Sequence, residues 1–486
     1  MKKIPPISAT DVTPQRGLFS PAEVAEAIPP AVDCAICPDE PALVGQPRVI
    51  RPERHQIEVR WLSLDQLLAP DHSARGVYAF VEQLDLSALY DQIKAVEGEP
   101  GRDASDPRVL FAVCLYATIE GISSGREIAR RCTEGNYLDF QWLCGGVPVN
   151  RDMICAFRVA HGDVLNQALT DSVAALMKEG LVDLNLVAQD GMRVRASAGK
   201  SSFRREPTLE ELHKIAQEQV DRLHREAMEN ENASTVTARQ EAARKRAAEQ
   251  RNERVKQALT NVAEIAKHKE ARKKEDGPKA RASTTDPEAR IMKMANGGYN
   301  PAFNVQFCTD TRSHIIVSVD VNNIGSDAGL TPPMIAQIKE RYGLLPKGML
   351  TDGGFSTKED IEQAAAAGVT LYTPVKEEEQ KREKGIDPFE PLRKDSPAMG
   401  EWRQRMGKPE SKEIYKKRAA TAEYSNAQAR NHGLQQFRVR GTEKVKVIAT
   451  WYALALNLIR AGALRAAATT QGTMGAVRAA AAMEGG

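Results

Sequence analysis

The stretch that decides the fold is LNLVAQDGMRVRAS, residues 184–197, in which an apolar run ends at Asp190. Upstream, from about residue 61, apolar residues recur at the spacing of helices. Downstream, apolar residues alternate or form short continuous runs, which is typical of strands. The change of period predicts a helical region followed by a sheet whose first strand runs through Asp190.

Four further segments predict strands, and two segments between them predict helices. The strand segments are AFNVQFCTD (302–310), HIIVSVDVNN (314–323), GMLTDGGFS (348–356) and VTLYTPV (369–375), and the helices cover 331–342 and 357–368. This order predicts an α/β fold, a mixed sheet with helices on its faces. Asp190 and Asp352 are both expected at strand carboxyl ends, where open α/β sheets hold their sites.

The upstream region is expected to be all-helical. Ser63 and Asp106 are suitable helix caps, and Pro107 suits a first helical position. A glycine-containing turn at residues 121–125, followed by Arg126, Arg130 and Arg131, would suit a helix-turn-helix that reads DNA. The alternative is an ordinary helical bundle with a solvated basic face.

Two charged interruptions divide the predicted sheet. The first, 199–296, predicts one or two long helices, and between Arg239 and Arg281 it holds 14 basic against 7 acidic residues. It is either a solvated hairpin or a phosphate-binding arm. The expected organisation is a flexible lead-in over 1–50, a helical and DNA-binding domain over 51–180, a catalytic domain over 181–462 with insertions at 199–296 and 376–411, and an Ala-rich tail over 463–486.

Composition excludes several classes of protein. The chain has 67 Lys+Arg against 65 Asp+Glu, so its net charge alone does not indicate nucleic acid. Its seven cysteines are scattered, which favours reduced thiols, and the Cys34–Cys37 pair is interpreted as incidental. No secretory signal and no window of about 18 apolar residues is apparent, so we expect a soluble, cytoplasmic protein with no membrane partner.

Three carboxylates carry the predicted chemistry: Asp190, Asp352 and, on a helix in IYKKRAATAEYSNAQARN (414–431), Glu423. Phosphoryl transfer often uses two divalent ions about 4 Å apart, which activate an attacking oxygen and stabilise a leaving oxygen. Magnesium prefers carboxylate and water oxygens and needs few protein ligands. Each aspartate also precedes glycine, and Asp-Gly is a common turn. For each aspartate alone, the turn is therefore the simpler interpretation.

The surroundings of the carboxylates favour a site for a phosphodiester. Glu423 shares a helical face with the small residues Ala419, Ala420 and Ala427, which predicts close packing of that face on the sheet. Basic residues that would contact phosphate flank the carboxylates. These residues are Lys416 and Arg430 beside Glu423, and Arg193 and Arg195 after Asp190.

Two polar residues share one face of the strand predicted over 302–310. Asn304 and Gln306 alternate with apolar neighbours, so both point to the same side. They either hold DNA or cover an outer face of the sheet. The second reading is favoured, because polar residues commonly face solvent in a sheet.

Several separated motifs in one order resemble a bacterial insertion-sequence DDE transposase from about residue 55 to about residue 462. These motifs are VAQDGMRVRAS, TDPEARIM followed by GGYNPAFNVQ, LTDGGFST and YKKRAATAEYSNAQARNHGLQQFRVRG. The resemblance implies a ribonuclease-H-like core with Asp190, Asp352 and Glu423 as the metal-binding triad. Related transposases carry Tyr, Arg, Glu and Lys along this last helix. Here Tyr415 and Arg418 have the expected spacing. Glu423 lies one residue beyond the position expected for the glutamate, so Glu413 stays open as the alternative third ligand.

The resemblance also implies a function. Such an enzyme binds the terminal inverted repeats of its element, cleaves the DNA with Mg²⁺, for which Mn²⁺ substitutes, and joins the freed 3′-hydroxyl to target DNA. It acts in the cytoplasm at the nucleoid, as a homo-oligomer on paired DNA ends. Two alternatives stay open: a metal-dependent nuclease of the same fold that does not join strands, and an inactive DNA-binding descendant.

Overall fold

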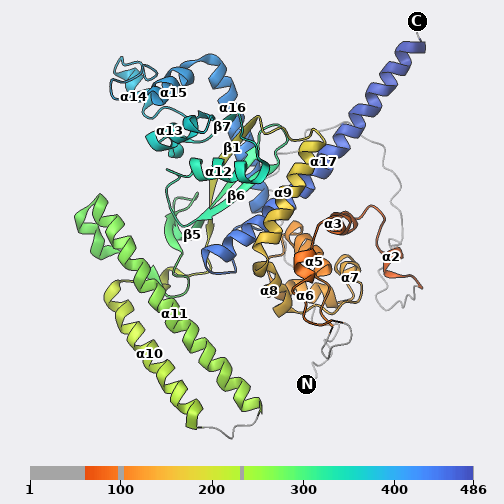
Figure 1. Cartoon of the computed structure of the whole chain (residues 1–486), viewed down its shortest axis with the longest axis vertical. Helices are drawn as coiled ribbons and strands as arrows, with labels where there is room; N and C mark the ends of the chain where they lie inside the picture. Colours follow the sequence, from red (N-terminus) through yellow and green to blue (C-terminus); the bar gives the residue numbers. More distant parts are fainter. Residues whose placement is uncertain (1–60, 97–102, 230–234, 485–486) are drawn as a thin grey trace, which may run out of the picture. The chain divides into compact units, whose positions relative to one another are not determined.

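The central sheet is organised around the strand that carries Asp190. In the computed structural model, which describes residues 61–96, 103–229 and 235–484, β1 spans Leu186–Arg195 and pairs along its length with antiparallel β5, Tyr299–Asp310 (Figure 1). The predictions for residues 1–50, including the Cys34–Cys37 pair, fall outside the described residues. The five cysteines within them, Cys114, Cys132, Cys144, Cys155 and Cys308, are all free thiols.

The sheet is mixed, as predicted. Its path is β4–β5–β1–β7–β8, and β6 pairs with β5 on the same edge as β4. The remaining strands are β4 Arg290–Lys293, β6 Ile316–Asn322, β7 Gly348–Leu350 and β8 Thr370–Tyr372. β1, β7 and β8 are parallel to one another. Because β1 and β7 run side by side in one direction, the residues that follow β7 come near the second half of β1.

Helices cover both faces of the sheet. β5 is buried from Pro301 to Asp310 on both sides, so its polar residues cannot face solvent. α16, Pro409–Asn431, packs on β1 and β5, and α12, Thr331–Tyr342, packs on β6. α13, Lys358–Ala366, ends before Gly368 at a left-handed φ of 78°, in agreement with the predicted end of this helix.

Eight helices in the described part of the chain precede the sheet. They are α2 Leu64–Leu67, α3 Ser73–Glu82, α4 Ser87–Tyr90, α5 Pro107–Ile119, α6 Gly125–Thr133, α7 Leu138–Cys144, α8 Arg151–Ala160 and α9 Gly162–Lys178. α5 begins as predicted: the Asp106 carboxylate accepts the Arg108 N–H at 2.8 Å, and Pro107 occupies the first turn. Nearly all of α5 is buried, which makes it the central helix of this region.

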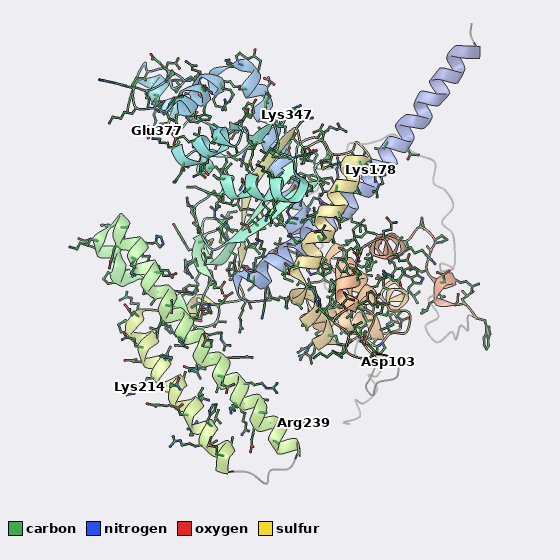
Figure 2. The ribbon with its side chains drawn as sticks, in the orientation of Figure 1. Asp103, Lys178, Lys214, Arg239, Lys347 and Glu377 are labelled. Atoms are coloured by element: carbon green, nitrogen blue, oxygen red, sulfur yellow. The ribbon has the colours of Figure 1, made fainter. Side chains whose placement is uncertain are left out.

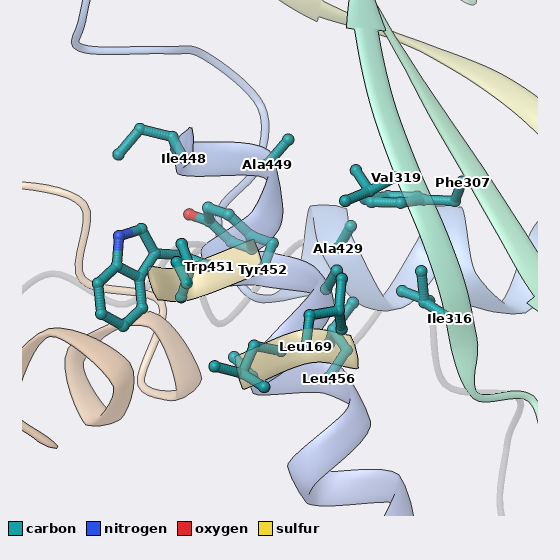
Figure 3. Packing of buried hydrophobic residues seen from close by; sticks show 14 of the residues in the cluster. Leu169, Phe307, Ile316, Val319, Ala429, Ile448, Ala449, Trp451, Tyr452 and Leu456 are labelled. Carbon is teal, nitrogen blue, oxygen red and sulfur yellow. The ribbon is translucent and has the colours of Figure 1, made fainter. Parts of the chain in front are cut away.

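A long final helix, α17, joins the helical region to the sheet. It spans Thr442–Glu484, so the Ala-rich stretch continues a helix instead of forming a separate tail. Among its buried residues, Leu456 lies beside Leu169 of α9 (Figure 3), and Trp451 packs on Phe111 of α5, with 4.7 Å between the ring centroids. The same helix packs on β6 and β5. One hydrophobic core therefore runs through both regions, and the predicted burial of residues 451–459 is confirmed for most of them.

The expectation that no apolar stretch approaches membrane-spanning length is wrong. Within the described residues, Thr442–Thr470 of α17 is long and apolar enough to cross a membrane by length and composition. Most of that stretch is buried inside the protein, as in the core helix of a globular protein. Its apolar residues are explained by packing against β6, α9 and α5.

The first insertion contains two long helices, as expected. α10, Glu206–Glu229, and α11, Thr235–Arg272, lie side by side (Figure 1). A small core at their base includes Leu209, Ala258 and Val262. Charged side chains such as Lys214 and Arg239 extend outward from the pair (Figure 2). The insertion also contains a short antiparallel pair, β2 Phe203–Arg204 with β3 Ala282–Ser283, and strand β4, none of which was predicted.

The second insertion folds against the edge of the sheet. It contains α14, Glu378–Glu383, and α15, Pro397–Gly407. Trp402 of α15 is buried and donates its indole N–H to the Thr373 carbonyl at 3.1 Å, directly after β8. α15 thereby positions the start of α16, which follows one residue later and carries the candidate site residues.

Candidate nucleic-acid cleavage site

Asp190 lies in the middle of β1, not at its end. The strand continues through Gly191 to Arg195, and Asp190 pairs with Phe307 of β5. The prediction of a strand end there is wrong, because the Asp-Gly pair sits in an extended ladder and forms no turn. The Asp190 side chain faces α16 and has only 19% of its surface exposed.

Asp352 lies beside Asp190 at the end of the neighbouring strand. It follows β7 by two residues and caps a short 3-10 turn, Gly353–Phe355, where its carboxylate accepts the Gly354 N–H at 2.7 Å. This position agrees with the predicted strand end. The Asp352 side chain is 39% exposed, so it is the more accessible of the two carboxylates.

Arg418 of α16 bridges the two aspartates. Its Nη2 lies 3.2 Å from Asp190 Oδ1 and 3.8 Å from Asp352 Oδ2. The second Asp190 oxygen accepts a hydrogen bond of 2.9 Å from Asn426 Nδ2, two turns further along the same helix. α16 therefore holds the Asp190 carboxylate at both oxygens, from one face.

The electrostatics of the pair are those of crowded carboxylates. Burial raises the pKa of Asp190, the Arg418 guanidinium opposes that shift, and the negative charges of Asp352 and Asp327 reinforce it. Burial raises the pKa of the phenol of Tyr415, one turn before Arg418, and the negative charges of both aspartates raise it further. A cation that joined Asp190 and Asp352 would relieve their repulsion.

Glu423 lies on the exposed side of α16. Within the described residues, its carboxylate forms no hydrogen bond or ion pair, and no contact joins it to Asp190 or Asp352. The predicted packing of its alanine face is wrong: Ala419, Ala420 and Ala427 are exposed. The face that packs on the sheet holds Ala422, Ser425 and Ala429 instead, and Ser425 Oγ lies 2.9 Å from Thr309 Oγ1.

The predicted basic residues divide into three groups. Arg193 and Arg430 line one hollow of about 390 Å³ together with Lys293. Lys416 forms an ion pair with Glu413, the alternative third ligand, and both side chains are exposed. Arg195 lies in a different hollow, at the end of β1.

In the helical region, Arg126 is exposed, whereas Arg130 is already paired. Arg130 binds Glu127 and Glu134 on its own helix, and its guanidinium also donates to the Tyr137 hydroxyl at 2.8 Å. Arg130 and Arg131 lower the pKa of Glu127 to about 2. The charge of Arg126 is therefore more available to a DNA phosphate than the charge of Arg130.

A buried polar cluster behind β1 escaped the sequence reading. Asp327 is 8% exposed and accepts hydrogen bonds from Asn304 Nδ2 at 2.8 Å and Gln306 Nε2 at 2.9 Å. Arg193 completes the cluster at 3.1 Å. The favoured reading of Asn304 and Gln306 as an outer face is wrong, because the loop after β6 folds over them. The alternation of Asn304 and Gln306 with apolar residues was the one sequence signal for this cluster.

The polar cluster explains why glycine follows Asp190. A Cβ on Gly191 would lie 2.5 Å from Gln306 Nε2 and 2.6 Å from Asp327 Oδ1. The cluster thus occupies the space that a side chain would need. Asp190 faces α16, while the next residue leaves room for Asp327 on the opposite face of the strand.

The candidate ligand atoms are of the type that a hard cation prefers. Asp190 and Asp352 offer carboxylate oxygens, and magnesium is commonly held by one or two carboxylates together with substrate phosphates. The Arg418 guanidinium already lies between them, which shows that this position accepts positive charge. Within residues 61–96, 103–229 and 235–484, no group of three or more His, Cys, Asp or Glu side chains is arranged to hold a metal ion. Of the three predicted ligands, Asp190 and Asp352 are the two that the structure brings together.

Two family models match the chain. Residues 62–160 match a model described as a transposase domain (DUF772), and residues 265–458 match a model described as a transposase DDE domain. No curated protein and no solved structure matches. The first match covers most of the helices before the sheet; the second includes Asp352 and Glu423, while Asp190 lies between the two.

These matches define the class: the chain is a transposase. More narrowly, it belongs to the DDE transposases of insertion sequences, with the two matched domains in the order that the sequence motifs predicted.

Proposed function

We propose that this transposase binds the terminal inverted repeats of its insertion sequence and catalyses metal-dependent DNA cleavage and strand transfer. The observation that supports the proposal best is the pairing of Asp190 and Asp352 through Arg418, within a chain of the DDE family. Under this proposal the core is ribonuclease-H-like and spans residues 181–462, with the helical region of residues 51–180 contributing to recognition of DNA.

The proposed catalytic residues are Asp190, Asp352 and Glu423. Mg²⁺, or Mn²⁺ in its place, held by these carboxylates would activate the attacking oxygen and offset charge at the leaving oxygen. Glu423 would join from the exposed side of α16, next to the buried Ala422. The exposure of Glu423 and Asp352 leaves this side of the site open to DNA.

The protein's own groups have distinct parts in the proposed reaction. Asn426 and Arg418 fix the orientation of the Asp190 carboxylate. The Arg418 guanidinium, which lies between the two carboxylates, offsets part of their negative charge. Arg193 and Arg430, in their shared hollow, are proposed to contact the DNA backbone, as are Arg195, Lys416, Arg126 and Arg130.

The proposal extends to the setting of the reaction. The enzyme would act in the cytoplasm, on the nucleoid, and as a homo-oligomer that pairs two element ends. Its partners would be the duplex DNA of the inverted repeats and of the target.

The test is an incubation of purified protein with labelled inverted-repeat duplex and Mg²⁺ or Mn²⁺. We expect nicking and joining by the wild type, and loss of both in Asp190→Asn and Asp352→Asn. Nicking without a joined product would identify a nuclease of the same fold instead. Binding to DNA without metal-dependent cleavage would leave an inactive DNA-binding descendant.

A further inference from the structure

A polar hollow of about 590 Å³ lies where the helical region meets the end of β1. It is formed by the turn between α5 and α6, the end of β1, and the strap, as we name residues 433–441, which link α16 to α17. The lining residues are Gly121, Ser123, Arg195, Ser197, Gly433, Gln435, Gln436, Phe437 and Arg438. Arg195 and Arg438 are the charged residues among them, and both are cationic.

Main-chain contacts fix the walls of this hollow. The Arg195 N–H donates to the Gln435 carbonyl at 3.2 Å, and the Phe437 N–H donates to the Arg195 carbonyl at 2.8 Å. Gly121 and Gly433 both have left-handed φ, at 70° and 93°. A Cβ on Gly433 would lie 2.9 Å from the Gly121 carbonyl oxygen, so the two turns touch through backbone alone. The hollow is therefore built before any ligand arrives.

The positive charge in the hollow has no acidic partner. Arg438 Nε donates to the neutral Ser123 hydroxyl at 2.9 Å. Neither Arg195 nor Arg438 forms an ion pair with a described carboxylate. By contrast, Arg193 in the neighbouring hollow is paired with Asp327. Two guanidinium groups beside neutral serine and glutamine groups suit an anion with several oxygens.

We propose that this hollow binds a backbone phosphate of duplex DNA. The inference rests on the proposed function, which supplies DNA as the substrate. Arg195 follows Asp190 by five residues on β1, which corresponds to about 16 Å at about 3.3 Å per residue. This separation is short enough for one duplex to span both sites.

The first measurement is DNA affinity without metal. Full-length protein is titrated against labelled inverted-repeat duplex by fluorescence anisotropy, between about 50 and about 200 mM salt. We expect the double variant Arg195→Gln, Arg438→Gln to bind about tenfold more weakly. Its slope of log affinity against log salt should fall by about one for the lost phosphate contact. Arg438→Lys should keep most of the slope, because the charge remains.

Two controls accompany this titration. Arg312→Gln removes an exposed arginine that is paired with Asp183, and it should leave affinity and slope unchanged. Thermal unfolding checks that each variant is folded, and the single variants Arg195→Gln and Arg438→Gln serve if the double variant is not. Both side chains are exposed, so their loss should be tolerated.

The second measurement locates the contact. Duplexes with one neutral methylphosphonate at successive positions should bind wild-type protein more weakly when the substitution removes the charge of the phosphate held in the hollow. The double variant should not respond at that position. A response at no position, or an equal response in both proteins, would overturn the proposal.

Two further outcomes separate the rival explanations. If inorganic phosphate raises the melting temperature of the wild type but the double variant binds DNA normally, the hollow holds a free anion and the DNA assignment fails. If the double variant binds normally while Asp190→Asn abolishes nicking, the inference fails and the proposed function stands. If wild-type protein never nicks DNA yet shows the phosphate footprint, the proposed function fails and the phosphate site stands.

Discussion

At the scale of single residues, the site depends on what β1 presents to its two faces. Asp190 points toward α16, where Arg418 and Asn426 hold both carboxylate oxygens. The adjacent Gly191 leaves space on the other face for Asp327 and the amides bound to it. β1 thus carries Asp190 on one face and leaves room for the Asp327 cluster on the other. A change on one face is expected to disturb the other.

Gly191→Ala tests this coupling. A methyl group there would overlap Asp327 Oδ1, so either β1 or the polar cluster must shift. Overpacking of this kind costs about 1–3 kcal/mol, and we expect that loss of unfolding free energy in urea together with reduced nicking. Gly76→Ala is the matched control, because Gly76 is an exposed position of α3 whose Cβ would meet nothing within 4 Å, so alanine should stabilise the helix. Unchanged stability in Gly191→Ala would contradict the described cluster.

At the scale of elements, the TDPEAR segment joins the arm to the start of α17. Asp286 is fully buried and accepts the Gly441 N–H at 3.3 Å. The next carboxylate, Glu288, contacts both Gln257 of α11 and the Thr442 N–H at 2.7 Å. Two acidic residues of one short segment therefore connect α11, the end of the strap and the start of α17.

Asp286→Asn should stabilise the fold in a pH-dependent way. Burial raises the pKa of Asp286 from 3.8 to about 6. The ionised form is therefore disfavoured in the folded state: its cost is absent below about pH 3.8, grows through about pH 6 and is complete above that. At pH 8 we expect the variant to gain up to about 3 kcal/mol in denaturant unfolding, and close to nothing at pH 4. An equal gain at both pH values would rule out ionisation as the cause.

The third proposed carboxylate, Glu423 on α16, can be replaced without a loss of protein stability. Glu423 and Glu413 are both exposed, so neutralising either should change the free energy of unfolding by less than about 0.5 kcal/mol. We expect Glu423→Gln to lose nicking by at least about a hundredfold, equivalent to about 2.7 kcal/mol of transition-state stabilisation, while Glu413→Gln keeps it. The reverse result would assign the third position to Glu413.

How far the sequence predicts each element depends on how local its signal is. The arm helices, the capped start of α5 and strands β5 to β8 follow from period, caps and glycine, and all were predicted. β4 and the β2–β3 pair are too short for a periodic signal. Asp327 was not predicted because it lies more than a hundred residues after Asp190 in the sequence. Only the folding of the loop after β6 brings it to β1. Asp190 was placed at a strand end because Asp-Gly usually marks a turn.

At the scale of the whole molecule, α17 joins the two regions that match family models into one folding unit. It contacts α5, α8 and α9 before the sheet, as well as β5 and β6 within it. The matched regions are separated in the sequence by α9, β1 and most of the two arm helices. The helical region is therefore not an appendage on a linker, and a phosphate held at the strap would be in fixed relation to Asp190.

Trp451→Ala tests this shared core. Trp451 is 2% exposed, its ring lies 4.7 Å from that of Phe111 on α5, and its indole N–H donates to the Arg158 carbonyl at 3.0 Å. Removing a buried tryptophan costs about 3–5 kcal/mol. Because α17 also packs on β6, we expect one unfolding transition at lower temperature, with hydrogen-exchange protection falling together in α5 and β5.

Ile459→Ala on the same helix is the matched control, since Ile459 is 42% exposed and its truncation should leave the melting temperature nearly unchanged. Loss of protection in α5 alone, with β5 still protected, would show that the helical region unfolds by itself. The region proposed to recognise DNA ends and the candidate cleavage site would then lie on separable bodies, and the distance from the strap to Asp190 would not be fixed by the fold.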